Sequence, residues 1–210
     1  DDSQAVAVLS GAGGAFCAGA DLKQVAGSSD YVAWAGDPDG PTNPTLSKPV
    51  IAAVEGHAVA GGLGIALWCD IRIVDETTVF GVFCRRWGVP MSDGTTVRLP
   101  RLIGAARALD MLITGRGVNA DEAIDWGLAT RRAAKGQTRQ VAEELALQIA
   151  GFPQIAMRSD RMSAYKQAGQ TMEDAVRTEK ELSQEAKAIE ASEGAARFAT
   201  GAGRHGEFSE

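Results

Sequence analysis

Two glycine-bearing segments could place bare backbone amides at the start of a helix. Residues 18–21 read Ala-Gly-Ala-Asp and residues 60–62 read Ala-Gly-Gly, and a helix is predicted after each. The first amides of a helix lack an intrahelical partner and lie at the positive end of its dipole, so they attract an oxyanion. Either segment alone is also typical of an ordinary glycine turn. Together, converging on one oxygen, they would form an oxyanion hole suited to a thioester enolate.

The sequence around these segments predicts short strands alternating with helices. Apolar runs between turn residues indicate buried strands, and helical spacing that ends at glycine indicates helices. The predicted strands cover residues 5–9, 49–54, 57–60, 70–74, 79–81 and 128–130. The predicted helices begin at Asp21 and cover residues 63–69, 95–103, 105–114, 121–126, 138–150, 155–168 and 171–190. This order of elements favours an α/β fold.

The character of the sequence changes after Gly136. Before it, strands alternate with helices, and residues 27–47 are rich in glycine, proline, aspartate and serine, which favours an exposed loop. After it, charged amphipathic helices follow one another with little strand beside them. We therefore expect an α/β core over residues 1–136 and a helical packing or oligomerisation region over residues 137–210.

The composition narrows the classes of protein. With 210 residues, 45% of them hydrophobic and 23% charged, the chain is typical of one globular domain with a small appendage. The net charge of −6 disfavours a nucleic-acid surface, because phosphate binding needs cations. No apolar run reaches the roughly 18 residues of a membrane helix and no signal peptide is recognisable, so we expect a cytoplasmic protein. Three cysteines without C-x-x-C spacing and two histidines predict neither a disulfide framework nor a metal centre.

Taken together and in order, the motifs closely resemble the crotonase (enoyl-CoA hydratase/isomerase) superfamily. The two glycine segments and their flanks carry the resemblance, in residues 14–22 (GAFCAGADL) and 48–62 (KPVIAAVEGHAVAGG). It continues through CDIR at 69–72, FG at 80–81, GVP at 88–90, RLPRLIG at 98–104 and LITGR at 112–116. The resemblance therefore covers nearly the whole chain.

The resemblance implies a crotonase-like spiral core of ββα units, a C-terminal helical region that trimerises and a coenzyme A thioester as substrate. By position, the family's two oxyanion donors fall on the backbone amides of Ala20 and Gly61. The residues then expected to contact the thioester are Ala18, Asp21, Leu22, Lys23, Gly62, Cys84 and Trp87. The family's opening strand and first helix have no counterpart, and the chain begins at Asp1, so we expect an N-terminal segment to be missing from this sequence.

Two positions depart from the family pattern. Hydratases of this family hold a water between two glutamates, one acting as base and the other as acid, and such proton transfer needs carboxyl groups within hydrogen-bond reach. Counted from Gly61, the first glutamate position holds Gly64, and counted from Phe80, the second holds Cys84. Neither a glycine nor a neutral thiol can orient and deprotonate water as that pair does. Efficient hydration is therefore not expected.

Three side chains could replace the missing glutamates. Asp93 stands one residue away from where some family members place an alternative catalytic carboxylate, and a helix N-cap is its other interpretation. Cys84 could be a nucleophile with its pKa lowered by Arg85 and Arg86, or a buried structural cysteine. His57 could be a base or a hydrogen-bonded structural residue.

These observations predict an acyl-CoA-processing enzyme that stabilises a thioester enolate. Isomerisation, decarboxylation or thioester hydrolysis is favoured over hydration, since each needs fewer placed carboxylates. Coenzyme A is expected as part of the substrate rather than as a resident cofactor, and the C-terminal helices favour a homotrimer or hexamer. The alternative is a catalytically silent trimeric acyl-CoA-binding or scaffold protein. Both hypotheses predict thioester binding, and only the first predicts turnover.

Overall fold

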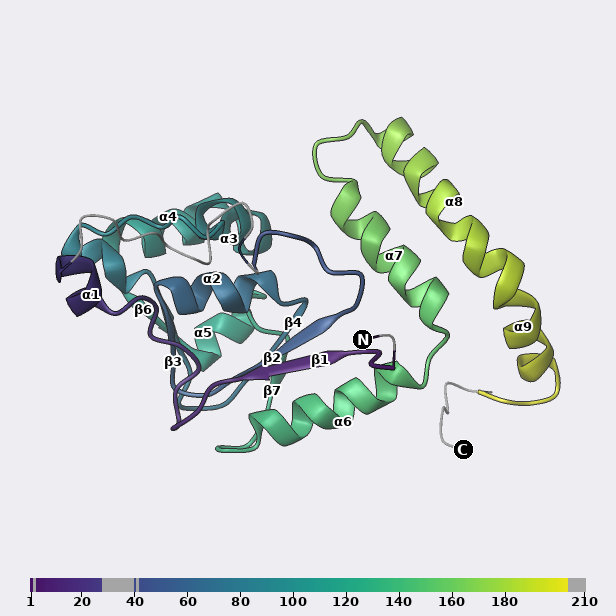
Figure 1. The fold of residues 1–210 in the computed structure, drawn as a ribbon, viewed down its shortest axis with the longest axis horizontal. Helices are drawn as coiled ribbons and strands as arrows, with labels where there is room; N and C mark the ends of the chain where they lie inside the picture. Colours follow the sequence, from purple (N-terminus) through teal and green to yellow (C-terminus); the bar gives the residue numbers. More distant parts are fainter. Residues whose placement is uncertain (2, 28–39, 41, 204–210) are drawn as a thin grey trace. The chain divides into compact units, whose positions relative to one another are not determined.

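The computed structural model describes residues 1, 3–27, 40 and 42–203 of the chain (Figure 1). The predicted exposed loop at 27–47 lies for the most part outside the described residues. The chain divides into two compact units, one of them Val6–Leu147 and the other Asp1–Ala5 together with Gln148–Glu210. The boundary expected after residue 136 precedes α6, whereas the first unit continues to Leu147, inside that helix.

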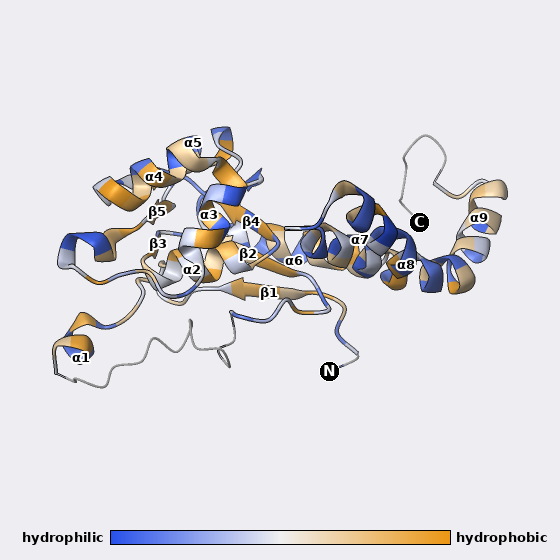
Figure 2. Cartoon of the chain, turned by 90° about the horizontal axis from the view of Figure 1, so that it is seen from above, coloured by the Kyte–Doolittle hydropathy of each residue, from blue (hydrophilic) through white to orange (hydrophobic). Residues whose placement is uncertain are grey.

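A parallel four-stranded sheet forms one side of the first unit. Its strands follow the order β1-β2-β4-β7 and comprise Ala7–Ser10, Val50–Val54, Ile71–Val74 and Arg131–Arg132. Ile51 pairs with Val8 on one side and with Ile71 on the other. Every residue of β2 is buried, which matches its unbroken apolar sequence, since the central strands of parallel sheets are covered on both faces. Figure 2 shows the apolar character of β1 at the start of this sheet.

A second sheet of three strands carries the turn that leads into α2. It has the order β3-β5-β6, with strands His57–Val59, Val79–Gly81 and Gly117–Asn119. Strands β3 and β5 are parallel, and β5 and β6 are antiparallel. The helices of this unit are α1 (Leu22–Gly27), α2 (Gly61–Trp68), the 3-10 helix η1 (Phe83–Trp87), α3 (Thr95–Ile103), α4 (Ala105–Thr114), α5 (Ala120–Asp125) and α6 (Thr138–Ala150).

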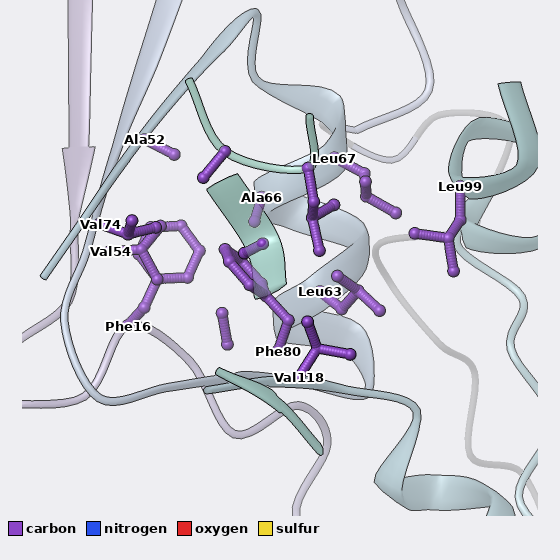
Figure 3. Packing of buried hydrophobic residues seen from close by; sticks show 14 of the residues in the cluster. Phe16, Ala52, Val54, Leu63, Ala66, Leu67, Val74, Phe80, Leu99 and Val118 are labelled. Atoms are coloured by element: carbon purple, nitrogen blue, oxygen red, sulfur yellow. The ribbon is translucent and has the colours of Figure 1, made fainter. Parts of the chain in front are cut away.

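Helix α2 packs into the core of the first unit. Leu63 of α2, Phe80 of β5 and Val118 of β6 are fully buried in one hydrophobic cluster (Figure 3). Burying a side chain of this size contributes about 1.5–3 kcal/mol. The buried Arg72 of β4 donates to the carbonyl oxygens of Cys69 at 2.6 Å and Leu128 at 2.6 Å. These bonds fix the C-terminal end of α2, so the position of its N-terminus is fixed as well.

The segment before α1 lies directly against the β3–α2 turn. The amide of Cys17 donates to the carbonyl of His57 at 2.9 Å, and the amide of Val59 donates to the carbonyl of Cys17 at 3.0 Å. A Cβ atom on Gly62 would lie 2.0 Å from the carbonyl oxygen of Cys17. This backbone contact therefore requires glycine at position 62, and it brings together the two glycine segments singled out from the sequence.

Three parts of the predicted secondary structure need correction. The strand predicted at 128–130 is wrong, because Leu128 is a fully buried turn residue and the strand is the short β7 at Arg131–Arg132. Strand β6 and helix η1 were not predicted, because both segments are too short to show the hydrophobic periodicity of a strand or a helix. The helix at Ala191–Ala199 was not predicted either, whereas the helix before it ends at Ile189, close to the predicted end at about Glu190.

The second unit is helical. It contains α7 (Gln154–Lys166), α8 (Met172–Ile189) and α9 (Ala191–Ala199), with α7 and α8 packed side by side (Figure 1). The carboxylate of Glu190 accepts hydrogen bonds from the amides of Ile155 at 3.0 Å and Ala156 at 2.8 Å, so it caps the start of α7. Figure 2 shows both hydrophilic and apolar residues on α8. None of the helices in the described residues combines the length and apolar character needed to cross a bilayer.

We expect Gly62→Ala to destabilise the protein by roughly 1–3 kcal/mol or more, because the added methyl group must push the Cys17 backbone away from α2. Urea denaturation measures the loss. Gly61→Ala is the matched control on the same helical turn, since its Cβ would meet its nearest neighbour, the Cα of Gly19, at an ordinary 3.5 Å. Equal stability of the two variants would contradict the contact.

Asp75, which follows β4, makes a contribution to the free energy of unfolding that depends on pH. Its side chain is 1% exposed and accepts hydrogen bonds from the Thr77 amide at 2.9 Å and the Gly136 amide at 3.0 Å. Burial raises the pKa of the Asp75 carboxyl, but the hydrogen bonds from Thr77 and Gly136 outweigh it and lower the pKa below its usual value. Because the pKa is lower in the folded state, the carboxylate stabilises the fold at pH values above the unfolded-state pKa. This stabilisation is lost as the pH falls through the folded-state pKa.

Asp75→Asn should therefore destabilise the protein by about 1–3 kcal/mol at neutral pH, since charged hydrogen bonds are lost. The difference from the parent should persist down to about pH 4, the usual aspartate range, and shrink below it. Urea denaturation at several pH values measures this. A deficit that stayed constant through the acid range would show that the charge of Asp75 is not responsible.

Candidate active site

A cavity of about 700 Å³ lies in the first unit. Its wall is built from the segment before α1 and from α1 itself, from the β3–α2 turn and from η1 with the loop before α3. The lining residues are Cys17, Ala18, Gly19, Ala20, Leu22, Val25, Val59, Ala60, Gly61, Ile65, Phe83, Cys84, Trp87, Gly88, Val89, Pro90, Met91, Ser92 and Asp93. Most of these side chains are apolar. Among the described residues that line the cavity, Asp93 is the only carboxylic acid.

The two segments expected to supply the oxyanion donors meet at this cavity. Ala20 and Gly61 both line it, and a Cβ on Gly19 would lie 2.9 Å from the amide nitrogen of Gly61. Gly19 has φ +86°, a conformation that glycine adopts without strain. No described residue accepts a hydrogen bond from the amide of Ala20 or of Gly61. Both N–H groups are therefore available to a ligand.

Ala60 has a strained backbone directly before Gly61. Its φ of +50° and ψ of −124° lie in a region that residues with a Cβ atom rarely adopt, and this costs on the order of 1–3 kcal/mol. The amide of Ala60 donates to the carbonyl of Gly81 at 2.9 Å, which ties the strained residue to β5. Strain of this kind is typical of functional sites. Here it sets the orientation of the peptide group that carries the Gly61 amide.

Asp93 reaches into the space left by Gly64. The Asp93 side chain is 6% exposed, and its Oδ1 atom accepts a hydrogen bond from the Thr95 amide at 3.0 Å. A Cβ atom on Gly64 would lie only 2.2 Å from Oδ2 and 2.4 Å from Cγ of Asp93. The carboxyl group thus occupies the place where a side chain at position 64 would begin. The position of a Cβ on Gly61 is 3.9 Å from the same Oδ2 atom, so the carboxyl group lies beside the amide expected to bind the thioester oxygen.

Cys84, at the second glutamate position, is a buried thiol. Its side chain lies 3.1 Å from the sulfur of Met91. Burial raises the pKa of the Cys84 thiol; Arg85 opposes this shift and Asp93 reinforces it. The guanidinium of Arg86 lies 4.4 Å from the ring centre of Phe83 and donates to the Gly115 carbonyl, which ties η1 to the end of α4. A neutral thiol is therefore expected at neutral pH, contrary to the hypothesis of an activated nucleophile.

The remaining predicted contact residues divide into two groups. Ala18, Leu22 and Trp87 line the cavity, and Trp87 is 71% exposed. Asp21, Lys23 and Gly62 do not line it. The Asp21 carboxylate accepts a hydrogen bond from the Lys23 amide at 2.9 Å at the start of α1, and Gly62 packs against Cys17 instead.

His57 also lies away from the cavity lining. It is exposed, and its ring meets that of Phe83 edge to face at 6.3 Å between centroids. No sequence motif had indicated the apolar wall, in particular Ile65, Phe83 and Met91. In this part of the chain the sequence had indicated Cys84, Trp87 and Asp93, and all three line the cavity. Among the described residues, no three His, Cys, Asp or Glu side chains gather as a possible metal site.

Comparison with known proteins agrees with this architecture. The profile of the family described as Enoyl-CoA hydratase/isomerase matches residues 1–202. Enoyl-CoA hydratase EchA19 of Mycobacterium tuberculosis is 38% identical over 159 residues, which are 72% of this chain and 60% of the relative. Carnitinyl-CoA dehydratase of Proteus mirabilis is 39% identical over 161 residues, 75% of this chain and 62% of the relative. The chain thus spans about three-fifths of the length of these relatives.

The fold is shared with solved structures as well. A crystal structure of enoyl-CoA hydratase from Mycobacterium tuberculosis superposes with a TM-score of 0.87 at 31% identity, covering 95% of this chain and 79% of the other. The α/β core and the C-terminal helices both lie within this match. With its profile match, its fold and two glycine segments that meet at one cavity, the chain belongs to the enoyl-CoA hydratase/isomerase family of the crotonase superfamily.

Proposed function

We propose that this chain processes a coenzyme A thioester through an enolate. The amides of Ala20 and Gly61 bind the thioester oxygen, and Asp93 transfers the proton. The observation that carries the proposal is the position of the Asp93 carboxyl group, buried in the same cavity as the two amides and next to Gly61. Each amide of an oxyanion hole contributes about 2.7–4 kcal/mol to transition-state stabilisation. A placed general base contributes a factor of about 10²–10⁴.

Hydration fits this site poorly. Adding water across a double bond needs one group to take a proton from water and another to deliver a proton to carbon. Here Gly64 has no side chain and Cys84 is a thiol whose pKa is raised by burial. One carboxyl group remains among the described lining residues, and most of the wall around it is apolar.

A shift of a double bond along the acyl chain needs one base only. Oδ2 of Asp93 removes a proton from a carbon atom of the bound thioester, and the electron pair of the broken C–H bond moves into the enolate. The two amides hold the negative oxygen. The same carboxyl group then returns the proton to another carbon, so no water or further reactant is consumed. Isomerisation therefore fits the site, and decarboxylation and thioester hydrolysis are the other two reactions compatible with a single carboxylate.

The cavity also indicates how the thioester is placed. Leu22 and Trp87 are both exposed and both line the cavity, so they are positioned to contact the part of the ligand that reaches solvent. The apolar side chains of Ile65, Phe83 and Met91 then face the acyl group. The three cysteines are free thiols, which fits a reducing cytoplasm.

Asp93→Asn tests this function. The amide oxygen of asparagine can still accept the Thr95 hydrogen bond, while the basic oxygen is lost, so kcat should fall by about 10²–10⁴. The assay offers a panel of enoyl-CoA and acyl-CoA thioesters and follows double-bond shift, hydration and release of free thiol. Asp125→Asn, an exposed aspartate outside the cavity, is the matched control and should keep the parental rate.

Two outcomes would contradict the proposal. Parental turnover in Asp93→Asn would remove Asp93 from the reaction. If the parent protein bound thioesters tightly but converted none of them, the hypothesis of an enzyme would be wrong. That result would support a binding or scaffold protein instead.

We infer that the chain assembles as a trimer, or as trimers paired into hexamers. The helical unit exposes large apolar side chains along α8 and α9, which contact with further copies of the chain would bury. These side chains are Met172 (81% exposed), Val176 (54%), Ile189 (58%) and Phe198 (62%).

Sedimentation at micromolar concentration should give a mass three or six times that of one chain. The double variant Met172→Lys with Val176→Lys should shift the protein toward smaller species, because it places charges on that surface. Glu179→Lys on the same helix is the control, since it replaces an exposed polar residue. A stable monomer for the parent would contradict the assembly.

A further inference from the structure

Gly64 stands in a helix without a backbone reason to be glycine. Glycine inside a helix is unfavourable relative to alanine, and the φ of Gly64 is not positive. The two other glycines of α2 have clear roles, since Gly61 lies at the cavity and Gly62 packs against the backbone of Cys17. For Gly64, the three atoms nearest to an added Cβ all belong to one side chain, the carboxyl group of Asp93, at 2.2, 2.4 and 2.8 Å.

The Asp93 carboxyl group cannot easily withdraw from this contact. Its Oδ1 atom is held by the Thr95 amide at 3.0 Å, and the side chain is 6% exposed. The backbone that carries it is also fixed, because Arg98 donates to the Asp93 carbonyl at 2.9 Å and to the Thr42 carbonyl at 2.7 Å. An added methyl group at position 64 would therefore displace the carboxyl group rather than slide past it.

We propose that Gly64 is a positioning residue for Asp93. Because Gly64 has no side chain, the Asp93 carboxyl group can occupy the space beside it. A carboxyl group at this place can therefore come either from a residue at position 64 of α2 or from Asp93 in the loop before α3, but not from both. The inference rests on the proposed function of Asp93. This has a direct consequence for the reaction catalysed. A glutamate at position 64 displaces the carboxyl group of Asp93 instead of adding a second one. The substitution Gly64→Glu alone therefore does not recreate the two carboxyl groups that hold the water in a hydratase.

Thermal unfolding tests the contact independently of activity. Gly64→Ala should lower Tm in the parent, because the methyl group collides with Asp93. In an Asp93→Ala background the same substitution should raise Tm, since only the gain in helix propensity remains. Gly194→Ala in α9 is the matched control, because a Cβ there meets open space, and it should raise Tm in both backgrounds. A Gly64→Ala effect of the same sign in both backgrounds would overturn the inference.

Kinetics test the positioning role. Gly64→Ala should lower kcat at least tenfold and leave KM within about threefold, because the amides and the apolar wall are unchanged while the base has moved. The variant Gly64→Glu with Asp93→Ala supplies the carboxyl group from α2. It should have a kcat at least tenfold above that of Gly64→Ala with Asp93→Ala. Equal kcat values for these two double variants would overturn the claim that the two positions serve one place.

The failure of this inference is distinguishable from the failure of the proposed function. If Asp93→Asn is inactive but Gly64→Ala keeps the parental kcat, Gly64 does not position the base and the proposed function stands. If Asp93→Asn keeps the parental kcat, the proposed function is wrong, and the positioning role of Gly64 is wrong with it.

Discussion

The site depends on a contact between two stretches of backbone that are far apart in the sequence. The carbonyl of Cys17 lies where a side chain on Gly62 would stand, and a Cβ on Gly19 would lie 2.9 Å from the amide nitrogen of Gly61. Hydrogen bonds between Cys17 and β3 hold the two stretches in register. Without this contact, Ala20 and Gly61 would belong to unrelated turns. With it, both amides line one cavity, and the sheets, α2 and Arg72 serve to keep that arrangement rigid.

The same region concentrates the unfavourable features of the fold. Ala60 is the non-glycine residue with positive φ among the described residues, and Asp93 places a carboxyl group in a mostly apolar wall. Burying such a group is costly unless it is hydrogen-bonded, and the Thr95 amide supplies that bond. A cavity that tolerates both features is typical of catalysis, because the strain and the buried carboxyl group are retained where they orient reacting groups.

Much of the fold could be predicted from local sequence signals. The helices at 95–103, 105–114 and 138–150 have the predicted bounds, since amphipathic spacing marks all three and glycine follows each of them. The two-residue strand β7 could not be predicted, because its pairing with Ile73 and Val74 depends on the turn around the buried Leu128. The family resemblance located Ala20 and Gly61. It identified Gly64 and Cys84 as lost glutamate positions and Asp93 as a candidate replacement, but no local pattern shows that Asp93 fills the space beside Gly64.

The central claim is that the two amides and Asp93 generate a thioester enolate. Exchange of the α-protons of a saturated acyl-CoA in deuterated water measures enolate formation directly, without requiring that the physiological product be known. We expect the protein to catalyse incorporation of deuterium at the α-carbon and Asp93→Asn to abolish it. An acyl-CoA that binds the protein but exchanges no faster than in buffer alone would show that this site does not form an enolate.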